Sequence, residues 1–405
     1  MIGRWHRTRL KYLVEANTAV LPESTDDDME FVYVDIGNVT QGSVNTNAAP
    51  IRFADAPSRA RRIAKPGDSV VSTVRTYLRA VATVPSHEEE LIFSTAFAVL
   101  SPREEVRPEF LAWYLQGDEF VSRVEAHSTG VSYPAITATQ LIALDLRLPS
   151  LEEQRVIADY LDRETARIDS LIEEQQRLID LLRERRQAVV LHAIAEQNTK
   201  AAAVDKLGRS ARIGNGSTPR RETAEYWSAS GFPWLNSSVV NEPRVARADQ
   251  FVTAEALREC HLPVVAPGSV LVGLTGQGKT RGMATILDIE ATVNQHVAYV
   301  TPDAMKWLPD YLLWSLRASY GELRRLSEEN GSTKGGLTCA ALNQFRLAAP
   351  TLDDQRRIAA YLDEQTARID TLIAETERFI ELSRERRAAL ITAAVTGQID
   401  VREAA

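Results

Sequence analysis

Two stretches of this 405-residue chain place their hydrophobic residues at a helical spacing, and the two stretches have closely similar sequences. Residues 157–195 contain no Gly or Pro, and Arg, Glu, Leu and Ile dominate them. Apolar residues recur there at spacings of three, four and seven, which is typical of an amphipathic helix with a coiled-coil seam. The stripe comprises Ile157, Leu161, Ile168, Leu171, Leu178 and Leu182 in the first copy and Ile358, Leu362, Ile369, Leu372, Phe379 and Leu390 in the second.

Both helical stretches begin at a capping signal. Ser150 precedes Glu153 by three residues, and Thr351 precedes Asp354 in the same way, each directly after a proline. About 46 residues at 1.5 Å each make a rod of roughly 70 Å, which needs a partner along its seam. We expect the two copies to pack antiparallel against each other. The alternative is that each helix docks only on its own globular domain.

The repeat extends beyond the helices. An offset of 201 residues carries 151–162 onto 352–363, and the same offset aligns Trp113 with Trp314. A duplicated unit predicts a pseudo-twofold molecule that performs one task at two places. The repeat divides the chain into four blocks, at 1–149, 150–197, 198–350 and 351–405.

The first and third blocks follow a strand pattern. Short β-branched and aromatic runs at 31–37, 68–74 and 93–100 predict strands, and a helical stretch follows in each block, at 108–124 and 309–326. Each block is large enough for its own core. We therefore expect an α+β fold, in which two long antiparallel coiled-coil helices separate two globular α/β domains.

Composition narrows the class of protein. Only two cysteines occur, Cys260 and Cys339, which excludes a disulfide framework and fits a reducing cytoplasm. The basic start of the chain is not followed by an apolar region, so we expect no signal peptide. No run of about eighteen apolar residues could span a membrane. The sequence thus predicts a cytoplasmic protein with no membrane partner.

For the chain as a whole, the net charge of −8 argues against a nucleic-acid partner. The charge is, however, unevenly distributed among the four blocks. The long helices hold most of the excess acid, whereas residues 198–350 contain 17 Lys and Arg against 14 Asp and Glu. The first block also groups Arg59, Arg61, Arg62 and Lys65. A nucleic-acid partner is therefore compatible with the distribution of charge.

Residues 273–280 match the phosphate-binding pattern G-x-x-x-x-G-K-[ST]. That loop needs a helix directly after it, but 283–289 predict a strand. The equivalent stretch of the first block, 72–79, lacks the pattern. We therefore predict a hairpin tip that carries Lys279 and Arg281, and a P-loop NTPase is the alternative hypothesis.

The sequence offers no constellation for catalysis or metal binding. The six histidines are scattered, and the neighbours Cys260 and His261 have no second ligand pair at zinc spacing. No cofactor-binding loop and no nuclease-like carboxylate cluster is evident. We expect a non-catalytic chain with no metal or cofactor of its own.

Small polar residues occupy matched loops of the two halves, at 129–137 and 330–338 and again at 35–40 and 235–240. Such loops suit contacts to the phosphates and base edges of DNA. The alternative is that their Gly and Asn serve only the backbone of turns. The candidate DNA-binding residues are Arg75, Arg79, Ser132, Tyr133, Asn236, Ser237, Gln277, Lys279, Arg281, Thr333 and Lys334.

The duplicated motif Leu-x-x-Gln-x-x-Ile-Ala-x-Tyr-Leu-Asp at 151–162 and 352–363 is followed in each copy by Arg-Ile-Asp-x-Leu-Ile. With these motifs the chain resembles, over essentially its whole length, the specificity subunit of type I restriction-modification systems. The first block departs from that family at Val74-Arg75-Thr76-Tyr77, where the family has a Gly-rich hairpin tip.

The resemblance implies that blocks 1–149 and 198–350 are target-recognition domains, each for one half of a bipartite, gapped DNA site. The helices would fix the gap and dock two modification subunits, which bind S-adenosylmethionine and methylate adenine, and restriction subunits, which use ATP and Mg²⁺. A specificity subunit of a stand-alone adenine methyltransferase and a purely structural scaffold are the alternatives. The helix residues implied in docking are Ile157, Leu161, Ile168, Leu171, Leu178, Ile358, Leu362, Ile369, Leu372 and Phe379.

Overall fold

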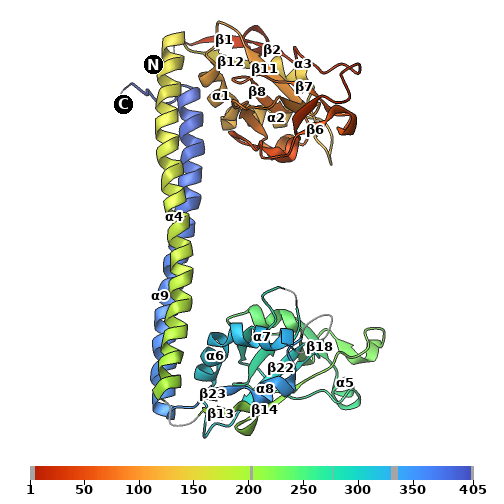
Figure 1. Cartoon of the computed structure of the whole chain (residues 1–405), viewed down its shortest axis with the longest axis vertical. Coiled ribbons are helices and arrows are strands. Elements are labelled where there is room, and N and C mark those ends of the chain that lie inside the picture. Colours follow the sequence, from red (N-terminus) through yellow and green to blue (C-terminus); the bar gives the residue numbers. More distant parts are fainter. Residues whose placement is uncertain (1–4, 201–203, 277, 330–335, 403–405) are drawn as a thin grey trace. The chain divides into compact units, whose positions relative to one another are not determined.

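The computed structural model describes residues 5–200, 204–276, 278–329 and 336–402. They belong to two compact units, one formed by 1–176 with 377–405 and the other by 177–376. Each unit combines a globular α+β domain with part of each of two long helices, α4 (Leu151–Lys200) and α9 (Leu352–Val395) (Figure 1). The predicted fold class is therefore confirmed.

The domain of the first unit contains two four-stranded sheets. One sheet has the order β2 (Val14–Ala16), β11 (Phe97–Pro102), β8 (Ser69–Ser72) and β9 (Val81–Thr83), and all its pairs are antiparallel. The other has the order β6 (Ile51–Arg52), β3 (Glu30–Val34), β10 (Leu91–Ser94) and β7 (Ala60–Ile63), with β3 and β10 parallel. The shorter ladders are β1 (His6–Arg9) with β12 (Asp145–Leu148) and β4 (Val39–Thr40) with β5 (Ser43–Val44).

Strand β11 contributes side chains to two hydrophobic cores, because successive side chains point to opposite faces of the sheet. Ala98 and Leu100 face the core shared with α1 (Pro108–Gln116) and α2 (Asp118–His127), whereas Phe97 and Val99 face the core beside β3 and β10. A third helix, α3 (Ala138–Ile142), precedes β12. All four β11 side chains are buried, so the strand forms the centre of the domain.

The domain of the second unit repeats this plan with a larger central sheet. Its order is β14 (Ala211–Asn215), β22 (Val297–Pro302), β19 (Val270–Gly273), β20 (Ala284–Leu287) and β17 (Arg244–Val245). A second sheet contains β15 (Trp227–Ser228), β18 (Gln250–Val252), β16 (Phe232–Leu235) and β21 (Thr292–Val293), and β13 (Val204–Lys206) pairs with β23 (Arg346–Ala348). The helices are α5 (Ala254–Glu259), α6 (Pro309–Ala318), α7 (Tyr320–Glu329) and α8 (Cys339–Gln344).

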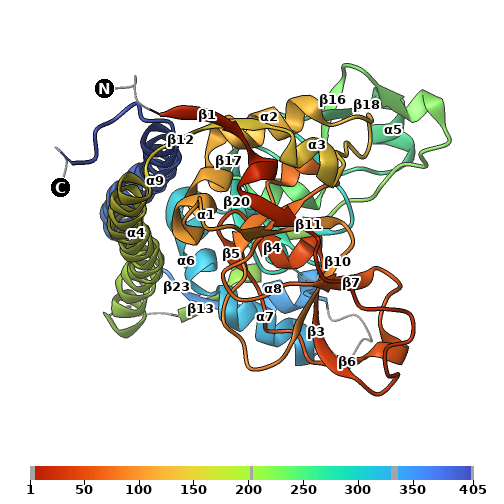
Figure 2. The ribbon, with the colours of Figure 1, turned by 90° about the horizontal axis from the view of Figure 1, so that it is seen from above.

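Within each unit, α4 and α9 run side by side and antiparallel, as the two views show (Figures 1 and 2). In the first unit Asp169 of α4 pairs with Arg387 of α9 at 2.9 Å. In the second unit the equivalent pair, Arg186 with Asp370, is 2.8 Å apart. The predicted packing of one copy against the other is therefore present, and within the described residues no helix is long and apolar enough to span a membrane.

The seam between the helices differs from the predicted stripe at its centre. Ile179 and Ile380 are 1% and 4% exposed, whereas Leu178 and Phe379 are 41% and 42% exposed. From Ile168, positions 172, 175, 179 and 182 of α4 follow at steps of four and three and are buried or half-buried, as a heptad requires, whereas the predicted spacing of seven from Leu171 reaches the exposed Leu178. Leu171, Leu178, Leu372 and Phe379 therefore lie on the surface of the helices, and Ile157, Leu161, Ile168, Ile358, Leu362 and Ile369 are buried within the chain.

Two further predictions need correction. The run 93–100 is not one strand, because β10 ends at Ser94 and β11 begins at Phe97 in the other sheet. The helical stretch 108–124 is divided at Gly117, whose backbone is extended, into α1 and α2. The second copy is likewise divided, into α6 and α7.

Candidate nucleic-acid interface

Two predicted loops of the first domain lie against each other. The Arg75 N–H donates to the carbonyl of Pro134 at 2.8 Å, and the Ile136 N–H donates to that of Thr73 at 2.9 Å. These bonds place the Arg75 guanidinium 4.9 Å from the centre of the Tyr133 ring, within the range of a cation–π contact. Arg75 and Tyr133, 58 positions apart in the sequence, thus form one surface.

Apolar and polar side chains project from this surface. Tyr77, Leu78, Val131 and Tyr133 are all large and exposed, and Ser132 between them is exposed as well. Arg75 has a left-handed backbone with a φ of 50°, which is uncommon for a residue with a side chain. An exposed patch of this kind is typical of a binding surface.

Arg79 pairs with two carboxylates of its own domain. Its guanidinium is 2.5 Å from the Asp118 carboxylate and 3.6 Å from that of Glu125, both on α2. Two acidic partners offset its charge, so Arg79 fastens the hairpin loop to α2. It is a weaker candidate than Arg75 for contact with a phosphate.

The corresponding loop of the second domain is a hairpin between β19 and β20, which pair antiparallel. A strand therefore follows 273–280 where a P-loop requires a helix, and this contradicts the NTPase hypothesis. The Arg324 guanidinium donates to the Gly278 carbonyl at 2.7 Å, and the Tyr320 hydroxyl donates to that of Lys279 at 3.2 Å. These bonds hold the tip with the Lys279 side chain exposed.

Arg281 is largely buried at the base of this hairpin. It is 9% exposed and pairs with Glu328 at 3.2 Å, so it is a weaker candidate for direct contact with DNA than Lys279. The ion pair ties the base of the hairpin to α7. Three other candidates, Gln277, Thr333 and Lys334, lie outside the described residues.

Asn236 and Ser237 lie at the start of a short 3-10 helix, Ser237–Asn241. The Asn236 side-chain oxygen accepts a hydrogen bond from the Ser238 N–H at 2.8 Å, and both candidates are half-buried. In the first domain Asp35 caps the matching 3-10 helix, Ile36–Asn38. These residues therefore have a backbone role in addition to any contact with a ligand.

A third loop, which the sequence did not single out, completes each surface. In the second domain it is the β21–β22 turn, residues 294–296, where the His296 carbonyl accepts from the Leu274 N–H at 2.9 Å. In the first domain the β10–β11 turn, residues 95–96, makes the same contact through Ala96 and Thr73 at 2.8 Å. The only signal in the sequence was a polar Asn-Gln-His triplet between two strand-like runs.

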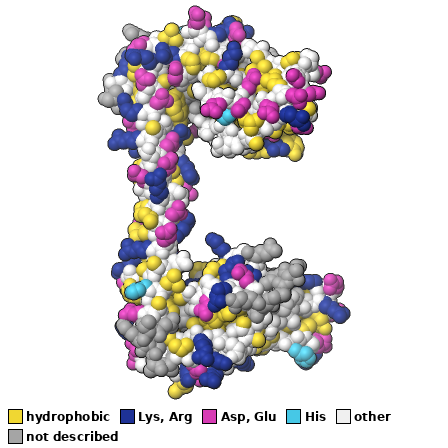
Figure 3. Space-filling model, viewed as in Figure 1, with side chains coloured by type: hydrophobic (Ala, Val, Ile, Leu, Met, Phe, Trp, Pro, Cys, Tyr) yellow, Lys and Arg dark blue, Asp and Glu magenta, His cyan; other side chains and the backbone are white. Residues whose placement is uncertain are grey.

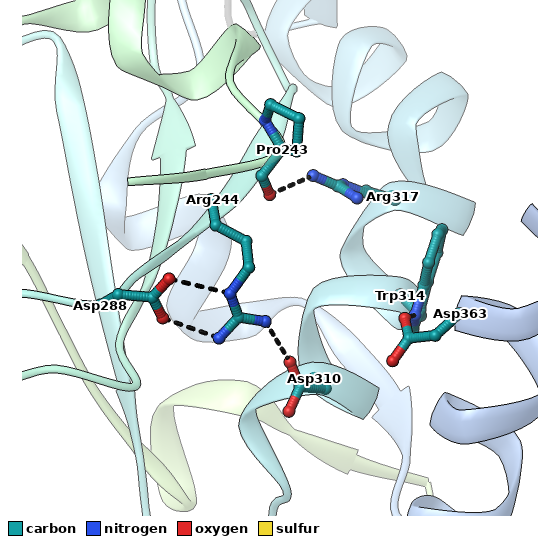
Figure 4. A network of polar contacts seen from close by, with 7 residues as sticks. All are labelled: Pro243, Arg244, Asp288, Asp310, Trp314, Arg317 and Asp363. Carbon is teal, nitrogen blue, oxygen red and sulfur yellow. Dashed lines mark hydrogen bonds and ion pairs between the residues drawn. The ribbon is translucent and has the colours of Figure 1, made fainter. Parts of the chain in front are cut away.

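An ionic network joins the sheet of the second domain to its helices (Figure 4). Arg244 donates two hydrogen bonds to Asp288, at 2.7 and 2.8 Å, and one to Asp310 of α6 at 2.8 Å. Hydrogen bonding to Asp288 raises the pKa of Arg244, and the guanidinium holds the pKa of Asp288 below its ordinary value. Burial, and then repulsion by Arg186, lowers the pKa of Arg317 to about 10, so this side chain stays charged at neutral pH.

Each domain is fastened to the long helices by the same buried contacts. The Gln154 amide oxygen accepts from the Arg107 N–H at 2.8 Å, and its nitrogen donates to the Pro149 carbonyl at 3.0 Å. Gln355 repeats these contacts in the second unit. The Trp113 indole donates to Asp162 at 2.8 Å, and the Trp314 indole donates to Asp363 at the same distance. The duplicated motif thus fixes the orientation of each surface on its helix.

The surface of the helices offers a second kind of interface. Large apolar residues are exposed on α4 and α9 in both units, and three from each unit lie near the middle of the helices; Figure 3 shows hydrophobic and charged side chains interspersed along the pair. The two sets are related by the offset of 201. We call them the helix-face clusters: Leu171, Phe379 and Leu382 in the first unit and Leu178, Leu181 and Leu372 in the second.

The chemistry of these surfaces is that of binding. Among the described residues, no group of three or more His, Cys, Asp or Glu side chains could hold a metal ion. The loops instead bring together hydroxyl, amide, imidazole and cationic groups on a rigid backbone. Such groups can hydrogen-bond base edges and phosphates.

Known proteins share both the sequence pattern and the fold. A model of the family described as type I restriction modification DNA specificity domain matches residues 4–180 and 204–381, once in each repeat. The specificity subunit of the Escherichia coli type I restriction enzyme EcoR124I/EcoR124II is 20% identical over 181 residues. That alignment covers 44% of this chain and 45% of the subunit, so it spans less than half of the relative.

Two solved structures are similar over nearly the full length. One, from work on complex assembly and conformational transition of the type I R-M system, is 23% identical, covers 98% of both chains and has a TM-score of 0.76. The other, the HsdS subunit from Thermoanaerobacter tengcongensis, is 24% identical, also covers 98% of both chains and has a TM-score of 0.59. At these identities the similarity establishes a shared fold.

Proposed function

The chain belongs to the family of type I restriction-modification DNA specificity proteins, and from this premise we propose that it is a non-catalytic subunit that recognises DNA. Each domain recognises one half of a bipartite, gapped sequence. The helices α4 and α9 set the number of unspecified base pairs between the halves, because a shift by one base pair moves a half-site by about 3.4 Å and rotates it about the axis.

One observation carries this proposal: both domains make the same backbone contact between the hairpin loop and the turn beside it, Thr73 with Ala96 and Leu274 with His296, and the loops around this contact carry different side chains. The first surface has Arg75, Ser132 and Tyr133, and the second has Asn236, Ser237 and Lys279. Two domains that share a backbone arrangement but carry different side chains are suited to recognise two half-sites of different sequence. We assign base or phosphate contacts to these six residues, with Lys279 and Arg75 as the cations nearest the backbone of the DNA.

The helix-face clusters are the proposed docking sites for two modification subunits, one for each cluster. Large apolar residues exposed at matched positions suit two copies of one partner. Of the ten helix residues that the sequence implied in docking, the four exposed ones are Leu171, Leu178, Leu372 and Phe379. The buried stripe residues act indirectly, because they hold α4 against α9 or against the domains.

The remaining chemistry belongs to these partners. We assign S-adenosylmethionine to the modification subunits, and ATP and Mg²⁺ to the restriction subunits. We place the assembly in the cytoplasm, with no membrane partner. This chain supplies sequence recognition and the docking surfaces.

The test is selection from a library of random DNA by the chain assembled with its modification subunits. The bound fraction is sequenced, and the proposal expects two short specified elements separated by a constant unspecified gap. A protein that enriches no sequence, or one contiguous element, would contradict the proposal. The modification subunits without this chain are the control, and they should enrich nothing.

A further inference from the structure

The β21–β22 turn lies where the loops of the second domain converge. The Asn294 N–H donates to the Leu235 carbonyl at 2.9 Å, and the Asn294 carbonyl accepts from the Gly216 N–H at 3.3 Å. The contact between Leu274 and His296 joins the turn to the hairpin that carries Lys279. The turn is therefore part of the proposed DNA surface, although none of its residues was a candidate.

Gln295 is the exposed residue of this turn, and its amide is held in place. Its side-chain oxygen accepts from the Thr218 hydroxyl at 2.7 Å. Its backbone carbonyl accepts from the Asn215 amide at 3.2 Å. No hydrogen bond from the Gln295 amide nitrogen to a described residue is present, so its two N–H donors and one oxygen lone pair can meet a ligand.

The turn is rigid. A Cβ at Gly216 would lie 1.7 Å from the Val293 carbonyl oxygen, so the backbone that carries Thr218 is packed directly against the turn. The His296 ring is 3.0 Å from the Thr275 hydroxyl, and the His296 N–H donates to the Asn294 side chain at 2.9 Å. A side chain held in this way loses little conformational entropy when it binds.

The first domain has the same turn with different side chains. It follows Ser94, the last residue of β10, and consists of Thr95 and Ala96, of which Thr95 is exposed. Ala96 takes the place of His296 in the contact with the hairpin. The backbone contact is thus kept in both domains while the exposed residue changes from Thr to Gln, as expected where two domains recognise different bases.

We propose that Gln295 determines specificity in the second half-site by contacting the major-groove edge of an adenine. This inference rests on the proposed function. A glutamine amide donates to adenine N7 and accepts from adenine N6 in a bidentate pair. Thr218 is a positioning residue that orients this amide, and His296 holds the turn that carries it.

The test repeats the selection from random DNA with the variants Gln295→Glu and Gln295→Ala. Glu keeps an acceptor for the Thr218 hydroxyl but replaces the amide donors by an acceptor, which suits the N4 donor of cytosine. We expect Gln295→Glu to lose adenine at one position of one half-site by about tenfold or more and to gain cytosine there. Gln295→Ala should lose the preference without a gain. The other half-site stays unchanged in both variants.

Gln344→Glu is the matched control, because Gln344 is exposed on α8 of the same domain, where its amide oxygen accepts from Lys206. It should select the wild-type sequence. If Gln295→Glu selected the wild-type sequence, or weakened every position equally, the assignment to one adenine would be overturned. A wild-type chain that selected no bipartite sequence would instead overturn the proposed function itself.

Discussion

The buried glutamines of the duplicated motif give the sharpest prediction about how each domain is held. Gln154 and Gln355 are fully buried, and each bonds backbone groups of the segment before α1 or α6. We expect Gln154→Leu to loosen the first domain from α4 and Gln355→Leu to loosen the second from α9. Leucine has a similar volume, so lost hydrogen bonding dominates the effect.

The free-energy cost of Gln154→Leu can be estimated from the polar groups that the substitution leaves without hydrogen-bond partners. Gln154→Leu removes the acceptor for the Arg107 N–H and the donor to the Pro149 carbonyl. A buried polar group without a partner costs about 1–3 kcal/mol, so two such groups cost roughly 2–6 kcal/mol of local opening free energy. Gln355→Leu should cost about the same, because Gln355 makes the two equivalent bonds, to Leu308 at 2.7 Å and to Pro350 at 2.9 Å.

Hydrogen–deuterium exchange measured by mass spectrometry resolves the two units separately. Gln154→Leu should speed exchange in α1 and β12 and leave α6 and β23 unchanged, and Gln355→Leu should do the reverse. Gln187→Leu is the control, since Gln187 is exposed on α4, and a surface change of this kind stays within about 0.5 kcal/mol. Exchange that matched the wild type in both glutamine variants would refute the reasoning.

Three further predictions concern the surfaces and the ionic network. Arg75→Ala should weaken DNA binding and reduce the slope of log affinity against log salt by about one, because one phosphate contact is lost; an unchanged slope in titrations would contradict this. Leu178→Glu with Phe379→Glu should abolish co-purification with modification subunits and leave the thermal midpoint unchanged, because both side chains are exposed; subunits that still co-purified would exclude docking there. Arg244 lowers the pKa of Asp288 from its ordinary value of 3.8. The ion pair therefore stabilises the folded domain above about pH 4, and this stabilisation is lost as the pH falls through the lowered pKa. Asp288→Asn should therefore lower the urea midpoint at pH 7 and converge with wild type in acid, and a pH-independent difference would count against it.

The sequence predicted the parts of the fold that depend on local pattern. Both long helices begin at the expected caps, since the Glu153 N–H donates to the Ser150 hydroxyl and the Asp354 N–H to that of Thr351. The antiparallel pairing of the copies followed from the repeat and is confirmed by the matched ion pairs. Periodicity and duplication carry this information without knowledge of long-range contacts.

The errors arose where long-range contacts decide the outcome. Leu178 and Ile179 are neighbours of equal hydrophobicity, and only the register against α9 buries the second. The run 93–100 suits a strand throughout, but pairing of β10 with β3 and of β11 with β8 imposes a turn. The sequence likewise gives no sign that Arg281 pairs with Glu328, 47 residues later. Which side chains of a loop are exposed therefore depends on contacts that the sequence alone does not show.

Recognition of two half-sites by two separate domains is the central claim. Its most direct measurement is a base-resolution map of adenine methylation in cells that contain this chain and its modification subunits, before and after residues 1–149 are exchanged for the equivalent block of another family member. The account predicts that one half of the methylated site changes while the other half and the gap stay constant. A methylated site that stayed the same, or changed in both halves, would contradict it.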